Sequence, residues 1–379
     1  MTERMRACLS TVGGIVVFVT LCVSPVAGQA PAARTKTTLA QTAGKVWTAP
    51  KTPWGDPDLQ GTWTTDSAFG IPLQRPAQFA GRAELNDDEF AQKSERDTRT
   101  RTAAENAVGS FRGDGAWLTR SFRQTSLIVE PADGIMPPLT ADAERRRAFA
   151  PRGTYGDGPF DGPEDFTLYD RCLTLGVVGS MTPKIYGNGH RLVQAPGYVA
   201  IMNEMIHEAR VIPLNGRPHV GSRIQMYMGD GRGHWEGETL VVETSNLNGK
   251  TNYSGVEMKL TERITRVEPD VLRYEARIDD PKTYARPFTV SIPLTSPPGY
   301  QVLPYECHEG NRALLQALGG ARAEDIALED DLKNGIVRTR KPVQNGLTVG
   351  GARVGEPGPG SDGAPPAQRG AGTAVPSGR

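Results

Sequence analysis

The stretch that decides the fold class is His-Arg-Leu-Val-Gln-Ala-Pro-Gly-Tyr-Val-Ala-Ile-Met (190–202), where two runs of strand-forming residues flank the turn Ala-Pro-Gly. The same arrangement recurs as far as Thr295. Asn215-Gly216, Gly229 to Gly233 and Glu236-Gly237-Glu238 supply turn signals. Between them the sequence predicts strands at 209–214, 224–228, 239–244, 260–267, 271–278 and 286–294.

Short, evenly spaced strands with no long helix between them are typical of an antiparallel barrel or sandwich. We therefore expect a mainly β fold, either a lipocalin-like antiparallel barrel that holds one ligand or a strongly bent sheet. A wrapping N-terminal arm and C-terminal helices would surround it. The expected divisions are a signal peptide (1–28), a linker (29–46), an irregular arm with short helices (47–180), the β-barrel domain with its C-terminal helices (181–335) and a disordered tail (336–379).

The beginning of the chain has the features of a secretory signal. Arg4 and Arg6 precede the apolar run Gly13–Val23, and small residues before Gln29 suit cleavage. The run is short for a stable membrane span, although an uncleaved anchor is the alternative. We expect a periplasmic or secreted protein with no stable membrane span after signal cleavage.

Helices are predicted in four places outside the strands. Asn86 and Glu89 form a capping-box pattern for a helix to about Thr102. A shorter helix should run from Leu139 to about Ala148, and Pro163 suits the first turn of a third that reaches Cys172. At the C-terminal end, Gly319-Gly320 should separate one helix from a polar helix at 323–333.

Charge and cysteine usage narrow the classes of partner. The chain has 43 basic and 43 acidic residues without a basic stripe, so we expect no nucleic acid partner. After signal removal two cysteines remain, Cys172 and Cys307, and in an oxidising compartment they should form a disulfide. The alternative is a thiol nucleophile at Cys307, beside His308.

Three clusters place an imidazole next to a carboxylate, a combination that can perform general acid–base catalysis. They are the run Asn203 to Arg210, the group around Asp230 and His234, and His308-Glu309. The candidate catalytic residues are Glu204, His207, His234 and His308, and the candidate substrate-binding residues are Asn203, Arg210, Asp230, Asn246, Tyr253 and Glu309. The alternative is that these residues are ordinary polar turn residues, and that Arg210 and Glu208 form a surface ion pair.

Metal and cofactor motifs are weak. The two-histidine helix motif of zinc proteases is missing, and the alternative is a zinc site assembled from His207, His234 and His308 on separate segments. We predict no cofactor, and metal ligands stay unknown. The sequence also lacks a nucleophile elbow, a phosphate loop and a dinucleotide fingerprint.

Several runs resemble a group of exported bacterial proteins of unassigned function. They are Pro-Trp-Gly-Asp-Pro-Asp-Leu-Gln-Gly-Thr-Trp (53–63), Asp-Arg-Cys-Leu-Thr (170–174), Glu-Met-Ile-His-Glu-Ala-Arg-Val-Ile-Pro-Leu (204–214), Gly-His-Trp-Glu-Gly-Glu-Thr-Leu-Val-Val-Glu-Thr (233–244) and Cys-His-Glu-Gly-Asn (307–311). The resemblance implies membership but no catalytic residue, and the strand pattern is similar to lipocalin-like barrels in architecture alone.

From the residues we expect an exported barrel that binds a small organic or saccharide-like molecule. It would act on that molecule by His/Glu acid–base chemistry, as a hydrolase, lyase or isomerase. The alternatives are a non-catalytic ligand-binding protein and an envelope assembly protein.

Overall fold

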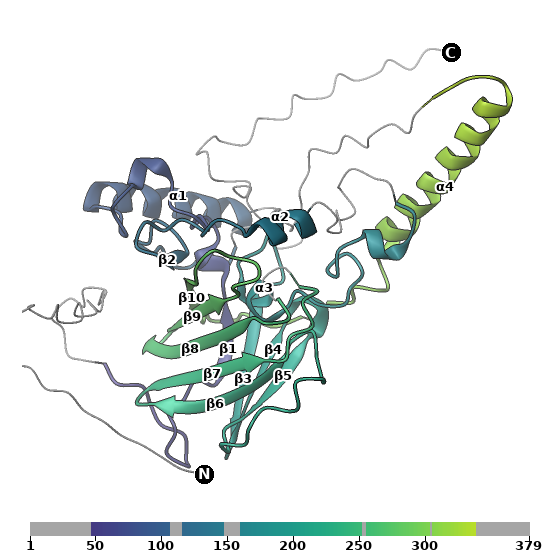
Figure 1. Cartoon of the computed structure of the whole chain (residues 1–379). Coiled ribbons are helices and arrows are strands. Elements are labelled where there is room, and N and C mark those ends of the chain that lie inside the picture. Colours follow the sequence, from purple (N-terminus) through teal and green to yellow (C-terminus); the bar gives the residue numbers. More distant parts are fainter. Residues whose placement is uncertain (1–46, 107–115, 148–159, 252–254, 304, 339–379) are drawn as a thin grey trace, which may run out of the picture. The chain divides into compact units, whose positions relative to one another are not determined.

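The computed structural model describes residues 47–106, 116–147, 160–251, 255–303 and 305–338 (Figure 1). The predicted signal peptide, linker and most of the tail lie outside the described residues. The strands are β1 (Gly61–Thr64), β2 (Ile128–Glu130), β3 (Gly189–Ala195), β4 (Tyr198–Asn203), β5 (Ala209–Pro213), β6 (Asp230–Glu236), β7 (Thr239–Ser245), β8 (Lys259–Glu268), β9 (Val271–Asp279) and β10 (Phe288–Thr295).

The α-helices of the described residues are α1 (Asp87–Glu105), α2 (Ala141–Arg147), α3 (Val177–Met181) and α4 (Arg312–Lys333). Short 3-10 helices are η1 (Asp66–Ala68), η2 (Ala77–Phe79), η3 (Pro163–Asp165) and η4 (Met205–His207). None of the described helices combines the length with the apolar composition that crossing a bilayer requires.

All ten strands belong to one antiparallel sheet in the order β5-β4-β3-β1-β10-β9-β8-β7-β6, with β2 also paired to β10. The mainly β fold class is therefore confirmed. The hydrogen-bonded order ends at β5 and β6, so the sheet is not closed into a hydrogen-bonded barrel. β1, from the segment expected to be an arm, lies inside the sheet between β3 and β10.

The two end strands, β5 and β6, are nevertheless neighbours, and side chains of β5 and of Leu214 after it pack against the backbone of β6. A Cβ placed on Gly233 of β6 would lie 2.6 Å from Leu214 Cδ2 and 2.9 Å from Ile212 Cγ2. The missing side chain of Gly233 therefore leaves the space into which β5 packs. We call this contact between Ile212, Leu214, Gly231 and Gly233 the β5–β6 seam.

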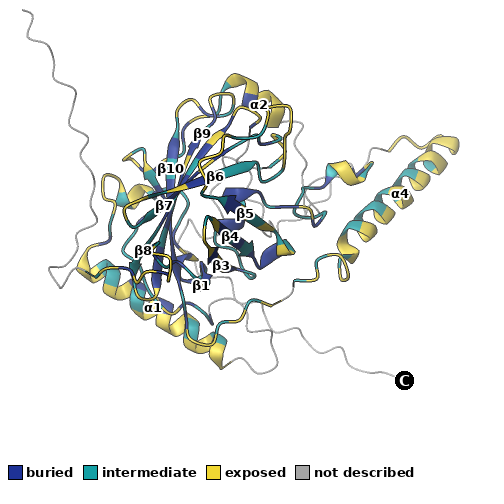
Figure 2. Cartoon of the chain, turned by 90° about the horizontal axis from the view of Figure 1, so that it is seen from below, coloured by how far each residue is buried: buried dark blue, intermediate teal, exposed yellow. Residues whose placement is uncertain are grey.

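Alternation along the strands turns one face of the sheet into the core. Trp63, Leu192, Ile201, Tyr274 and Phe288 are almost completely buried members of one hydrophobic cluster. Figure 2 shows burial concentrated on the strands, while α4 has no buried residue. The concave face is therefore filled by packed side chains from most of the strands.

One predicted strand and one predicted turn have a different structure from the one expected. The expected strand 224–228 is a loop with one isolated bridge from Met226 to Leu247. The run Gly229 to Gly233, expected as a turn, enters β6, and only its first glycine begins the change of direction, with a φ of 62°. The glycines after it are in the strand because the β5–β6 seam requires small residues there.

Helix predictions succeed where the local signal is strong. Asn86 and Glu89 form the expected capping box of α1. The helix expected from Pro163 to Cys172 is wrong, because only the turn η3 forms and Cys172 has a left-handed φ of 55°. The two C-terminal helices are one continuous helix, α4, which passes through Gly319-Gly320 at a cost of about 1 kcal/mol per glycine.

The disulfide between Cys172 and Cys307 is present, with the two Cα atoms 5.8 Å apart. Asn311 Nδ2 donates a hydrogen bond to the Asp170 carbonyl nearby. The sulfur of Cys307 is thus used in a crosslink between segments 135 residues apart, and the thiol-nucleophile alternative does not hold in this state.

Candidate functional site

Glu204 and His207 occupy the connection between β4 and β5. The Glu204 carboxylate is 8% exposed and accepts hydrogen bonds from Gly189 N (2.9 Å), Tyr300 Oη (2.7 Å) and Leu303 N (3.0 Å). These three donors make Glu204 an anchor for the chain around Tyr300. His207 is exposed in this tight turn, with a left-handed φ of 58°.

Asn203 lies next to Glu204 but points into the core face. Its Oδ1 is 2.9 Å from Nδ1 of His190, a fully buried residue that sequence reasoning did not select. Because Oδ1 can only accept, Nδ1 of His190 carries the proton. His190 Nε2 is buried and has no hydrogen-bond partner among the described residues.

Titratable groups with displaced pKa values surround this connection. Burial raises the pKa of Asp66, although Thr64 and Asn188 donate hydrogen bonds to its carboxylate. Burial lowers the pKa of Lys184 to about 7, against the opposing charges of Asp66 and Glu204.

Lys184 Nζ also donates to the carbonyls of Ser180 (2.9 Å) and Thr182 (2.8 Å) at the end of α3. Each group of this cluster therefore has a structural task. No motif in the sequence predicts that they meet.

Arg210 contributes to the core and not to an open site. Its guanidinium makes a two-pronged ion pair with Glu262 on β8, and Tyr274 Oη donates to the same carboxylate at 2.9 Å. Their side chains are 10% exposed for Arg210 and 0% for Glu262. β5 and β8 are far apart in the sheet order, so this pair spans the concave face.

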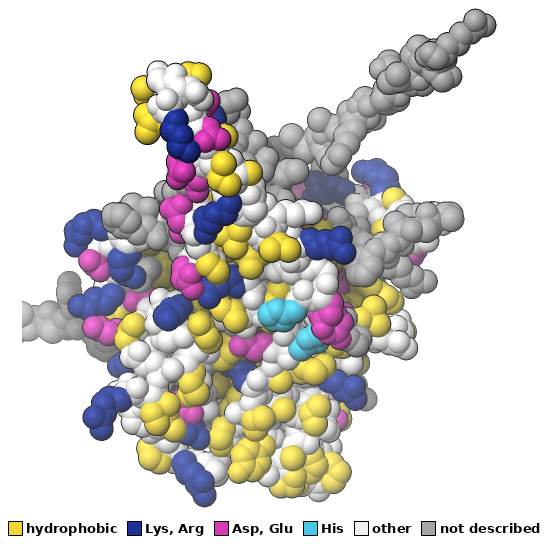
Figure 3. All heavy atoms as spheres, turned by 90° about the vertical axis from the view of Figure 1, so that its right-hand side faces the viewer, with side chains coloured by type: hydrophobic (Ala, Val, Ile, Leu, Met, Phe, Trp, Pro, Cys, Tyr) yellow, Lys and Arg dark blue, Asp and Glu magenta, His cyan; other side chains and the backbone are white. Residues whose placement is uncertain are grey.

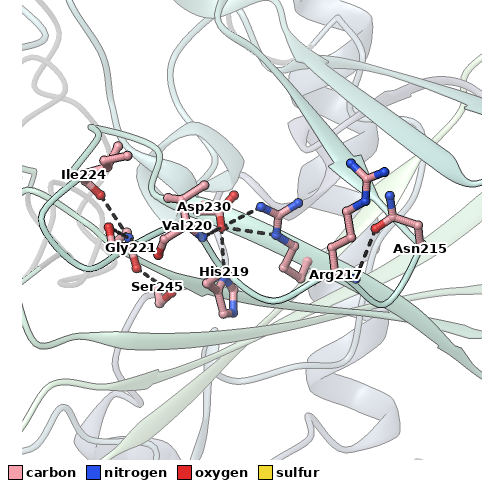
Figure 4. Close-up of polar contacts among 10 residues, drawn as sticks. Asn215, Arg217, His219, Val220, Gly221, Ile224, Asp230 and Ser245 are labelled. Carbon is pink, nitrogen blue, oxygen red and sulfur yellow. Dashed lines mark hydrogen bonds and ion pairs between the residues drawn. The ribbon is translucent and has the colours of Figure 1, made fainter.

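Asp230, at the start of β6, is the centre of a more open arrangement. Its Oδ2 lies 3.2 Å from His219 Nδ1 and accepts hydrogen bonds from Val220 N (2.9 Å) and Arg232 Nε (3.2 Å). Figure 4 shows His219 and Val220 converging on Asp230. A carboxylate oxygen accepts hydrogen bonds, so Nδ1 of His219 donates to it, and in the neutral ring Nε2 is the nitrogen with a free lone pair.

The loop that carries His219 is held in place by Asn246, which follows β7 with a left-handed φ of 59°. Asn246 Nδ2 donates to the carbonyls of Val220 (3.1 Å), Gly221 (3.1 Å) and Ile224 (2.9 Å) (Figure 4). Asn tolerates this backbone conformation better than most residues. Asn246 thus supports the loop through these three hydrogen bonds.

The remaining predicted residues lie elsewhere. His234 and Glu236 on β6 are both half exposed, with the ring nitrogen 3.4 Å from the carboxylate, and Arg263 of β8 pairs with Glu236 at 2.9 Å. His308 and Glu309 are exposed residues before α4. Tyr253 lies outside the described residues. The structure brings Asp230 and Asn246 to one site and does not bring His308 there by any contact.

The zinc hypothesis finds no donor set in the described part of the chain. No group of three or more His, Cys, Asp or Glu side chains in those residues is arranged to hold a metal ion. His207, His234 and His308 belong to three different segments.

The pair of His219 and Asp230 is the arrangement best suited to proton transfer. The His219 side chain is 33% exposed and that of Asp230 12%, so solvent reaches the ring while the carboxylate is mostly covered. Within the described residues Nε2 of His219 has no hydrogen-bond partner. Figure 3 shows histidine side chains beside acidic ones on one face of the molecule.

Such a pair can take a proton at Nε2 and stabilise the resulting cation through the carboxylate. Sequence reasoning selected Asp230 but paired it with His234. The sequence holds one weak signal for this pair: His219 lies eleven residues before Asp230.

Comparison of the chain with protein-family models, curated proteins and solved structures gave no match. The fold and the site therefore define the class of this protein only as a mainly β protein with a partly exposed histidine–aspartate pair.

Proposed function

We propose that this protein is an exported, periplasmic or secreted, protein that binds a small organic or saccharide-like molecule and acts on it by acid–base chemistry. The group that performs the chemistry is His219, oriented by Asp230. The reaction is a hydrolysis, an elimination or an isomerisation, because each needs a base that takes a proton and then returns it.

One observation supports this proposal most directly. Asp230 Oδ2 lies 3.2 Å from Nδ1 of His219, whose side chain is 33% exposed in a loop that Asn246 holds by hydrogen bonds. In a hydrolysis, Nε2 takes a proton from water as its oxygen attacks and gives that proton to the leaving group. In an isomerisation it takes a proton from one carbon and returns it to another.

Arg232 gives the pair a further property. Its guanidinium lies 3.0 Å from Asp230 Oδ2 and its side chain is 20% exposed. A guanidinium that shares this carboxylate with the imidazole can stabilise negative charge that develops on a substrate oxygen. The base, His219, and the electrostatic stabiliser, Arg232, thus both contact the carboxylate of Asp230.

The architecture we propose is lipocalin-like, a bent sheet whose end strands meet in the β5–β6 seam by side-chain packing. The core face is filled, so the ligand would bind at the loop that carries His219 and not inside the sheet. The resemblance to exported bacterial proteins agrees with an envelope location, and membership of that group is part of this proposal.

The test compares four variants of the mature protein with wild type: His219→Gln, Asp230→Asn, His234→Gln and His207→Ala. Protein is incubated with a defined mixture of sugars, lactones and hydroxy acids, and new products are detected by mass spectrometry. His219→Gln should lower turnover by about 10²-fold or more, and Asp230→Asn by a smaller factor. His234→Gln is the matched control, because His234 also lies beside a carboxylate but is half exposed, and its turnover should stay within about twofold.

Melting temperature is recorded for every variant. Full turnover in His219→Gln with an unchanged melting temperature would refute the assignment, and loss of turnover in His207→Ala would move the chemistry to the β4–β5 connection. If no product forms but a compound raises the melting temperature, the protein is the non-catalytic binder of the alternative. Co-purification of an envelope partner without ligand binding would favour an assembly role.

A further inference from the structure

A groove of about 480 Å³ lies between α1 and the segment Leu118–Ser121. None of the residues that line it belongs to the loop that carries His219. This volume is in the range of sites for small ligands. The polar residues that line it come from both walls: Ser94, Asp97, Thr98, Arg101, Thr119, Arg120 and Ser121.

The carboxylate of Asp97, which lines this groove, already has a cationic partner. Asp97 is 8% exposed, and its carboxylate pairs with Lys93, which is 5% exposed. Ser121 Oγ donates to the same carboxylate at 2.7 Å and so connects the two walls. Asp97 is therefore a fixed, compensated part of the lining and does not form a cation site.

The two arginines of the groove, Arg101 and Arg120, differ in how closely they pair with carboxylates. Arg120 Nη2 donates to both carboxylate oxygens of Glu268, at 2.8 and 2.7 Å, and Arg120 Nη1 lies 3.6 Å from Asp270 Oδ1. Arg101 Nε is 3.9 Å from Glu105, beyond hydrogen-bond distance, and its side chain is 31% exposed. Arg101 therefore keeps N–H donors for an anion, and a guanidinium fits one carboxylate through two parallel hydrogen bonds.

Hydroxyl groups supply the rest of the recognition surface. Ser94, Thr98 and Ser121 line the groove. The O–H of Ser121 is already donated to Asp97, so its oxygen is available as an acceptor. Thr98 donates to the Ser94 carbonyl at 2.8 Å and keeps its lone pairs for another donor. One available guanidinium with several hydroxyls suits a molecule that carries one carboxylate and several hydroxyl groups.

We propose that this groove binds a hydroxylated monocarboxylate of the sugar-acid class, with its carboxylate on Arg101 and its hydroxyls on Ser94, Thr98 and Ser121. The site is separate from His219. It can therefore exist whether or not the acid–base proposal is correct.

The test is titration calorimetry of the full chain with four probes. D-Glucuronate should bind, D-glucose and acetate should each bind at least about tenfold more weakly, and inorganic phosphate should not compete. D-Glucose lacks the charge and acetate lacks the hydroxyls, so each probe removes one half of the recognition. Equal binding of D-glucose and D-glucuronate, or no binding of D-glucuronate, would overturn the proposal.

Variants locate the site. Arg101→Gln should weaken D-glucuronate binding at least tenfold, and Arg101→Lys should lose less because the charge remains. Arg99→Gln is the matched control on α1, since Arg99 is 67% exposed and pairs with Glu95; its affinity should stay within twofold. His219→Gln should bind like wild type. An unchanged affinity in Arg101→Gln, with an unchanged melting temperature, would place the ligand elsewhere.

Discussion

Arg210 is a charged residue on an end strand, and its position shows how much a partner across the sheet matters. The local sequence suggested Glu208 as its partner or a ligand-binding role. Glu208 is instead hydrogen-bonded by Thr174, and burial raises the pKa of its carboxyl group. Arg210 reaches Glu262, 52 residues later, so no local pattern could identify this pair.

Replacing Arg210 by Met should destabilise the protein by about 3–5 kcal/mol, because Glu262 would then be buried without a countercharge. Urea unfolding measures the free energy. The double variant Arg210→Met/Glu262→Leu should recover most of the loss, since both charges leave the core. Arg263→Met, which removes a half-exposed pair, should cost under about 1 kcal/mol. If Arg210→Met lost no more free energy of unfolding than the control Arg263→Met, the role of the buried pair would be contradicted.

Asp230 and His234 show why strand geometry changes a predicted site. The sequence placed both residues near one turn, but both are in β6. Residues four apart on a strand are about 13 Å apart, because each residue advances about 3.3 Å. The carboxylate therefore meets His219, which returns to it through the loop before β6, and His234 meets Glu236.

At the scale of elements, the sequence predicts β5 well and β6 poorly. β5 has a local signal of β-branched residues before Asn215-Gly216. β6 contains Gly231 and Gly233, which locally indicate a turn. Their use in a strand depends on Ile212 and Leu214, whose side chains come from a distant element.

Gly233→Ala should destabilise the protein by about 1–3 kcal/mol, because its new Cβ would overlap Leu214 and Ile212. Gly231→Ala should cost less, since its nearest contact would be Val242 Cγ1 at 3.3 Å. Thermal unfolding of Gly233→Ala, Leu214→Ala and the double variant gives the coupling energy. Additive losses would show that the β5–β6 seam is not tightly packed.

At the scale of the whole molecule, stability should depend on pH through His190. Burial, together with the nearby charge of Lys184, lowers the pKa of this imidazole to about 3, against the hydrogen bond to Asn203. The unfolded chain binds a proton at His190 below about pH 6.5, and the folded protein does not until about pH 3. Its contribution is therefore complete above pH 6.5 and is lost as pH falls towards 3.

Urea unfolding at pH 4, 5, 6 and 7 measures this effect. In that window His190 should add up to about 1.4 kcal/mol per pH unit to the slope of stability against pH. His190→Gln should remove that part of the slope. Identical slopes in wild type and His190→Gln would mean that the ring is protonated in the folded protein.

The sequence by itself determined the β-rich class, most strand positions, the capped start of α1 and the disulfide partners. These features depend on residues within a few positions of each other or, for the disulfide, on Cys172 and Cys307 being the two cysteines outside the predicted signal peptide. Tertiary structure alone decided that β1 enters the sheet, that glycines of β6 receive β5, and which acid meets Arg210 or His219. Those outcomes follow from strand register and side-chain packing between segments tens to hundreds of residues apart, which no local pattern encodes.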